Sequence, residues 1–114
     1  MTKDYIAISA EQDSRAANLF RGHTEAMRAH RQTMKAAQEP KALTPKVTEL
    51  MALAISITQR CEGCLIYHTK EAHRQGTSRQ ELLDTIAVAI EMGGGPATVY
   101  GASALEAFDQ FDNK

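Results

Sequence analysis

Residues 44–68 read TPKVTELMALAISITQRCEGCLIYH, and this stretch decides the fold. Thr44-Pro45 is typical of a helix start, with a capping hydroxyl before a proline at the first helical position. The following segment, Leu50–Ile57, is apolar at almost every position, so we expect its helix to be buried in the core. The chain should break at Arg60–Cys61 and continue as a second helix from about Cys61 to Gln75, which Gly76 closes. The sequence therefore predicts two consecutive helices with a cysteine pair at their junction.

The segments on both sides are also predicted to be helical. Ser9 with Gln12 resembles a capping box that opens a first helix. An apolar seam then follows at spacings of three and four, formed by Ala16, Phe20, His23, Met27, His30, Met34 and Ala37. Glu39-Pro40 should end this helix, because the residue before a proline is pushed out of the helical region.

A second capping box and a glycine run divide the remaining chain. Ser78 with Glu81 precedes LLDTIAVAIEM, and Gly93-Gly94-Gly95-Pro96 separates this helix from a last one that ends near Phe111. No segment alternates in the manner of a strand. The prediction is an all-α fold, a single domain of five to six helices, with residues 1–39 as an N-terminal helical segment and residues 40–114 as the core.

Length and composition limit the classes of function. The chain has 114 residues, 43% of them hydrophobic and 24% charged, with a formal net charge of −1. This length suits one domain. The near-neutral charge gives no reason to expect nucleic acid or an acidic membrane as a partner. The first residues lack a signal-peptide pattern and no apolar run is long enough to span a bilayer, so we expect a cytoplasmic protein without membrane contact.

The only two cysteines form the motif Cys61-Glu62-Gly63-Cys64, followed four positions later by His68. On a helix these three side chains fall within an arc of about 60°. The positive end of the helix dipole favours a thiolate at Cys61, and the imidazole of His68 can take a proton from a thiol. A thiolate beside a second thiol attacks peroxides and disulfides. The pattern therefore predicts a redox-active dithiol.

Other interpretations of the cysteines remain open from the residues alone. A structural disulfide would close a loop of only four residues and so remove little entropy from the unfolded chain. Cys61, Cys64 and His68 could instead bind zinc, with Glu49 or His73 as the fourth ligand, although a second Cys/His pair from another segment is lacking. The cysteines could also be unreactive thiols in a non-catalytic helical oligomer.

Glu49 is unusual because it lies at the edge of the apolar segment. It lies either on a narrow exposed stripe, with Ser56 and Arg60 near its face, or in the core with a partner. A carboxylate held in the core could carry protons. His23 and His30, in the first helix, are expected to be packed and hydrogen-bonded side chains rather than ligands, and His73 is expected at the surface.

The spacing Glu49, eleven residues, Cys61-x-x-Cys64, three residues, His68 resembles the AhpD-like alkylhydroperoxidase branch of the carboxymuconolactone decarboxylase family. GGGPATVYGA, residues 93–102, also looks like the family's sequence, and the resemblance covers roughly residues 40–108. It implies an all-helical fold that assembles as trimers or hexamers.

The resemblance also implies a peroxidase mechanism. Cys64 would attack the peroxide, Cys61 would resolve the sulfenic acid to a disulfide, and an external dithiol of lipoyl or thioredoxin type would reduce it. Glu49 and His68 would form the proton relay, and no cofactor is expected. One position departs from the pattern: the well-known peroxidases carry a histidine directly before the second cysteine, where this chain has Gly63. Peroxide reduction could therefore be weaker here.

Overall fold

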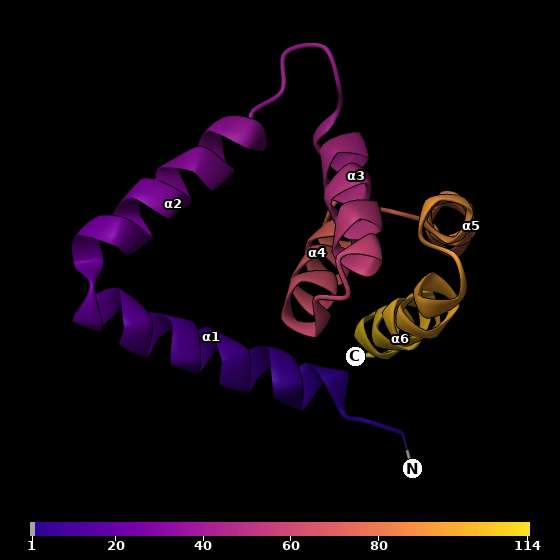
Figure 1. Cartoon of the computed structure of the whole chain (residues 1–114), viewed down its shortest axis with the longest axis horizontal. Helices are drawn as coiled ribbons and strands as arrows, with labels where there is room; N and C mark the ends of the chain where they lie inside the picture. Colours follow the sequence, from indigo (N-terminus) through magenta and orange to yellow (C-terminus); the bar gives the residue numbers. More distant parts are fainter. Residues whose placement is uncertain (1) are drawn as a thin grey trace.

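The computed structural model describes residues 2–114, which fold into six helices without a strand (Figure 1). The helices are α1 (Tyr5–Gly22), α2 (Thr24–Ala37), α3 (Pro45–Thr58), α4 (Glu62–Arg74), α5 (Arg79–Gly93) and α6 (Gly95–Asp112). The all-α prediction is confirmed. None of the helices in residues 2–114 is long and apolar enough to cross a membrane.

Helices α3 to α6 form the core, and α1 and α2 extend away from it in a V (Figure 1). The largest fully buried core side chains are Leu53, Ile57, Leu65, Ile66, Leu82 and Phe108. Helix α1 reaches this core through Tyr5, whose side chain is 5% exposed. Helix α2 carries no buried residue, so it gains little from packing within the chain.

Most predicted helix ends are confirmed. Each depends on a capping hydrogen bond or a backbone conformation within a few residues of the helix end. The Thr44 hydroxyl accepts a hydrogen bond from the Val47 N–H, and Ser78 and Glu81 form the capping box in both directions. Gly76 closes α4 with a φ of 82°, a left-handed conformation that glycine adopts without steric cost.

The prediction of a single first helix is wrong at its start and in its middle. The carboxylate of Asp4 caps α1, and Ser9 lies buried within that helix. The chain then breaks at His23, where the imidazole Nδ1 accepts the Ala26 N–H and so caps α2. His23 and His30 are both exposed rather than packed. The apolar seam predicted one continuous helix, but the chain forms two helices with a cap at His23 between them.

The prediction that α3 is buried on nearly every side is also wrong. Leu53 and Ile57 are fully buried, but Val47, Met51 and Ile55 are 38%, 50% and 53% exposed. These three residues are four apart, so they form an apolar stripe along the outer face of α3.

Candidate functional site

The turn between α3 and α4 places the cysteine pair. It is a Schellman motif, in which the Arg60 N–H bonds to the Ile57 carbonyl and the Cys61 N–H bonds to the Ser56 carbonyl. Arg60 takes the left-handed position with a φ of 56°, which is uncommon for a residue with a side chain. The chain therefore reverses sharply and begins α4 immediately after Cys61.

Cys61 is the N-cap of α4, and its sulfur accepts the Cys64 N–H at 3.2 Å. The two cysteines form a disulfide with their Cα atoms 5.2 Å apart. Cys61 is half-buried and Cys64 is exposed. A sulfur held against the first-turn amides of a helix is favoured as a thiolate when the disulfide opens, because the amides and the helix dipole stabilise negative charge there.

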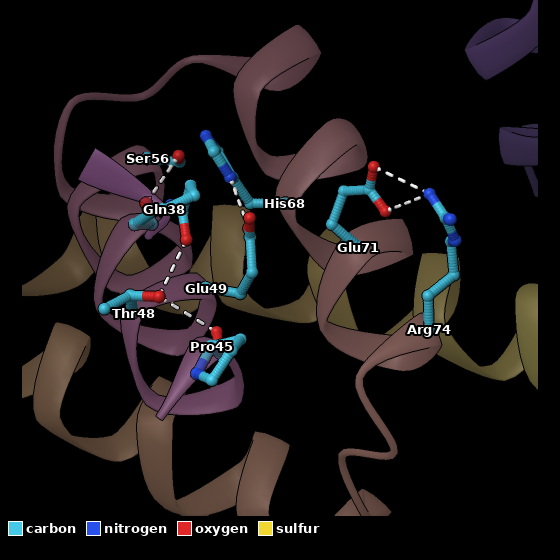
Figure 2. A network of polar contacts seen from close by, with 9 residues as sticks. Gln38, Pro45, Thr48, Glu49, Ser56, His68, Glu71 and Arg74 are labelled. Carbon is cyan, nitrogen blue, oxygen red and sulfur yellow. Dashed lines mark hydrogen bonds and ion pairs between the residues drawn. The ribbon is translucent and has the colours of Figure 1, made fainter. Parts of the chain in front are cut away.

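Glu49 and His68 form a partly buried pair that links α3 to α4. The Glu49 Oε2 lies 2.8 Å from the His68 Nδ1, and the two side chains are 8% and 20% exposed. Figure 2 shows the His68 ring pointing from α4 towards the carboxylate on α3. An ionised Glu49 accepts and does not donate, so this contact then requires the proton on Nδ1 and leaves Nε2 as the ring nitrogen that can accept one. Of the two positions predicted for Glu49, the structure has the one in the core with a partner.

The site is held together on the α3 side by further polar contacts. The Thr48 hydroxyl lies 2.7 Å from the Gln38 Oε1 and 2.9 Å from the Pro45 carbonyl (Figure 2). Gln38 is the residue that follows α2. Its contact with Thr48 therefore ties the end of α2 to α3, at the residue directly before Glu49. The Ser56 hydroxyl, predicted near the face of Glu49, bonds instead to the Ala52 carbonyl of its own helix.

The other histidine of α4 lies apart from this pair. The His73 Nε2 contacts the Asp112 Oδ1 at 2.9 Å, and its ring packs edge-on against Phe108. Within residues 2–114, no group of three or more His, Cys, Asp or Glu side chains is arranged to hold a metal ion. The four predicted site residues thus form two groups: a disulfide at the start of α4, and a carboxylate–imidazole pair between Glu49 of α3 and His68, one turn further along α4.

Two residues that lie near the cysteines are not indicated by any sequence pattern. The Lys3 ammonium pairs with the Glu62 carboxylate, and the Gln12 Nε2 donates to the Gly63 carbonyl at 2.9 Å. Both reach the motif from a distant part of the chain, so no local spacing in the sequence could have indicated them.

Comparison with known proteins assigns the family. The sequence model of the carboxymuconolactone decarboxylase family matches residues 22–107. The chain belongs to this family. Its fold is similar to the crystal structure of a carboxymuconolactone decarboxylase family protein from Legionella pneumophila, with a TM-score of 0.90 and 34% identity over 94% of this chain and 96% of that one.

Two further proteins are similar to this chain, one in sequence and the other in fold. An uncharacterised protein of Cupriavidus necator is 36% identical over 96% of both chains. A family protein of Thermotoga maritima, described with a possible involvement in antioxidative response, has a TM-score of 0.80 at 22% identity, over 97% of this chain and 92% of that one. At that identity the likeness concerns the fold alone.

Tyr67, which precedes His68, offers a test of the site's electrostatics. Burial raises the pKa of its phenol above the ordinary value of 10.0, and the Glu71 carboxylate adds to this. The folded state therefore favours the neutral phenol over the phenolate. The stability that depends on the neutral Tyr67 is complete below pH 10.0 and is lost as the pH rises through the pKa of the folded state. The absorbance titration of the native protein minus that of Tyr67→Phe should have its midpoint above pH 10.0, with folding checked by circular dichroism. A midpoint at or below this value would contradict the assignment.

Proposed function

We propose that this protein is a thiol-dependent peroxidase, a dithiol–disulfide oxidoreductase of the AhpD-like type. The observation that carries the proposal is the disulfide at the N-terminus of α4, one turn before His68 and its partly buried pair with Glu49. A disulfide between residues three apart contributes little to stability through chain entropy. A pair of thiols beside a proton acceptor is suited to reversible oxidation.

The first step is the oxidation of Cys64. The Nε2 of His68 takes the thiol proton, directly or through one water, and Glu49 stabilises the imidazolium that forms. The Cys64 thiolate attacks the O–O bond of a hydroperoxide and becomes a sulfenic acid. The O–O bond breaks, and the leaving oxygen takes the proton back from His68 to depart as an alcohol or water.

The second step forms the disulfide, and the third step restores the two thiols. The Cys61 thiol attacks the sulfenic sulfur, which forms the Cys61–Cys64 disulfide and releases water. An external dithiol of lipoyl or thioredoxin type then passes two electrons and two protons to the disulfide and is itself oxidised to a disulfide. We place this cycle in the cytoplasm, where such reductants are maintained.

Peroxide titration of the reduced native protein tests the proposal. Hydrogen peroxide and an organic hydroperoxide should each convert one equivalent of dithiol to the Cys61–Cys64 disulfide, seen by mass spectrometry as the loss of two hydrogens. Dihydrolipoamide or reduced thioredoxin should reverse this and sustain turnover. A disulfide that forms sluggishly with both peroxides but exchanges readily with these dithiols would reassign the protein to disulfide reduction. Thiols that resist both reagents would end the redox proposal.

We also propose that the protein is a homo-oligomer, a trimer or hexamer, as the resemblance implies. The apolar stripe of Val47, Met51 and Ile55 supports association, and α2 has no buried residue within the chain. Sedimentation velocity should give a mass three or six times that of the 12.5 kDa chain. A monomer at micromolar concentration would contradict the proposal.

A further inference from the structure

The amino-terminal segment holds both residues that lie between the two cysteines. Lys3 pairs with Glu62, but these side chains are 57% and 43% exposed, so water weakens their attraction. The contact between the Gln12 side-chain amide and the Gly63 carbonyl is partly buried. Every other side chain from position 10 to position 19 is exposed. Asp13 also lies 4.0 Å from the Lys70 ammonium of α4, but this pair is exposed to water. Gln12 is therefore the partly buried contact between the middle of α1 and the core, and it lies at the dithiol motif.

The absence of a side chain at Gly63 leaves room for the contact with Gln12. It lies in the first turn of α4 without a positive φ, so its backbone conformation does not require glycine. Glycine costs about 1 kcal/mol relative to alanine within a helix. A Cβ atom at this position would lie 3.1 Å from the Gln12 Oε1 and 3.8 Å from the Gln12 Cδ, with no other heavy atom as near. Gly63 thus leaves space that the Gln12 amide occupies.

We propose that Gln12 is a positioning residue for the dithiol and favours the disulfide over the two thiols. When the disulfide is reduced, residues 61 and 64 lose their covalent link, and the contacts of Glu62 and Gly63 help to hold the turn between them. Gln12 fixes the Gly63 carbonyl in the backbone arrangement in which the two sulfurs are joined. A contact that is made better in the disulfide form shifts the equilibrium towards that form.

This coupling acts in both directions. If Gln12 favours the disulfide, then reduction must weaken the hold of α1 on the core by the same factor. The inference rests on the reversible oxidation in the proposed function. It does not depend on whether peroxide or another disulfide is the oxidant.

The experiment measures the thiol–disulfide equilibrium of the full chain in buffers of reduced and oxidised dithiothreitol. In this exchange the protein disulfide gains two electrons and two protons from dithiothreitol, which closes to its own cyclic disulfide. Alkylation of the free thiols and mass spectrometry give the reduced fraction. Gln12→Ala should raise the equilibrium constant for reduction about 2- to 10-fold, the equivalent of one partly buried hydrogen bond. Gln12→Glu should have a similar effect, because a carboxylate cannot donate to the Gly63 carbonyl.

Gln110→Ala is the matched control. The Gln110 side chain accepts the Tyr5 N–H at 2.7 Å and donates to the Lys3 carbonyl at 2.8 Å, so it ties the start of α1 to α6. It has no hydrogen bond to residues 61–64. Its replacement should leave the equilibrium within about 2-fold of the native value. An equal shift in Gln110→Ala and Gln12→Ala would show that docking of α1 in general is responsible, and would overturn the role of Gln12.

Gly63→Ala completes the test as a double-mutant cycle. Its methyl group must push the Gln12 amide by a few tenths of an ångström, so it should shift the equilibrium in the same direction as Gln12→Ala and by less. In the Gln12→Ala background the methyl group has no amide to displace, and its effect should vanish. A reversible disulfide with the same equilibrium in native protein and Gln12→Ala would refute this inference and leave the proposed function intact. A disulfide that never re-forms would refute both.

Discussion

Cys64→Ser should abolish peroxide consumption, whereas Cys61→Ser should allow a single turnover that stops at a Cys64 sulfenic acid. The reason is that an external peroxide can reach Cys64 more easily than Cys61. Cys64 is exposed, while Cys61 is half-buried with its sulfur against the first turn of α4. An external peroxide therefore meets Cys64 first, and a serine hydroxyl in its place is too weak a nucleophile to react.

A sulfenic acid reagent such as dimedone distinguishes the two cysteines. After one equivalent of peroxide, mass spectrometry should find the adduct on Cys64 in Cys61→Ser and no adduct in Cys64→Ser. The opposite labelling would mean that the Cys64 N–H, which lies 3.2 Å from the Cys61 sulfur, activates Cys61 more than access favours Cys64. The roles of attacking and resolving thiol would then be exchanged.

The parts of the fold that the sequence predicts are those decided within a few residues. The hydroxyl caps at Thr44 and Ser78 and the glycine at Gly76 each act on the adjacent turn, so their residue types were sufficient. The break at His23 could not be predicted in this way. The apolar seam continues through it, and an imidazole is not among the preferred caps.

For the site residues, too, only the contacts between residues close in sequence could be predicted. The spacing of Cys61, Cys64 and His68 is local, so it placed all three on neighbouring turns of one helix. The partner of Glu49 is not local. Its own helix offered Ser56 and Arg60, but the Schellman turn at Arg60 brings α4 back along α3 and so brings His68 to the carboxylate. Gln12 meets Gly63 from 51 residues away, where only tertiary packing determines contact.

His68→Ala should slow the oxidation of the dithiol by peroxide about 100-fold or more, because it removes the proton acceptor. It should also lower the free energy of unfolding by about 1–3 kcal/mol, since the Glu49 carboxylate loses its partner at a partly buried position. Stopped-flow measurement of thiol loss and urea unfolding give the two effects separately. Glu49→Gln retains the shape of the side chain, so its oxidation should be slowed while its stability changes less.

His73→Ala provides the control from the same helix. His73 also contacts a carboxylate, but the side chains of His73 and Asp112 are 31% and 61% exposed, and they lie at the far end of α4 from the cysteines. Its loss should cost about 1 kcal/mol for the exposed pair and a similar amount for the contact with Phe108, and it should leave the oxidation rate unchanged. If His68→Ala and Glu49→Gln oxidise as fast as His73→Ala, the Glu49–His68 pair stabilises the packing of α3 against α4 and takes no part in the chemistry. A loss of rate in both His68→Ala and Glu49→Gln, with none in His73→Ala, would instead identify them as the proton relay, because Glu49→Gln largely keeps its stability and a structural defect alone would not slow it.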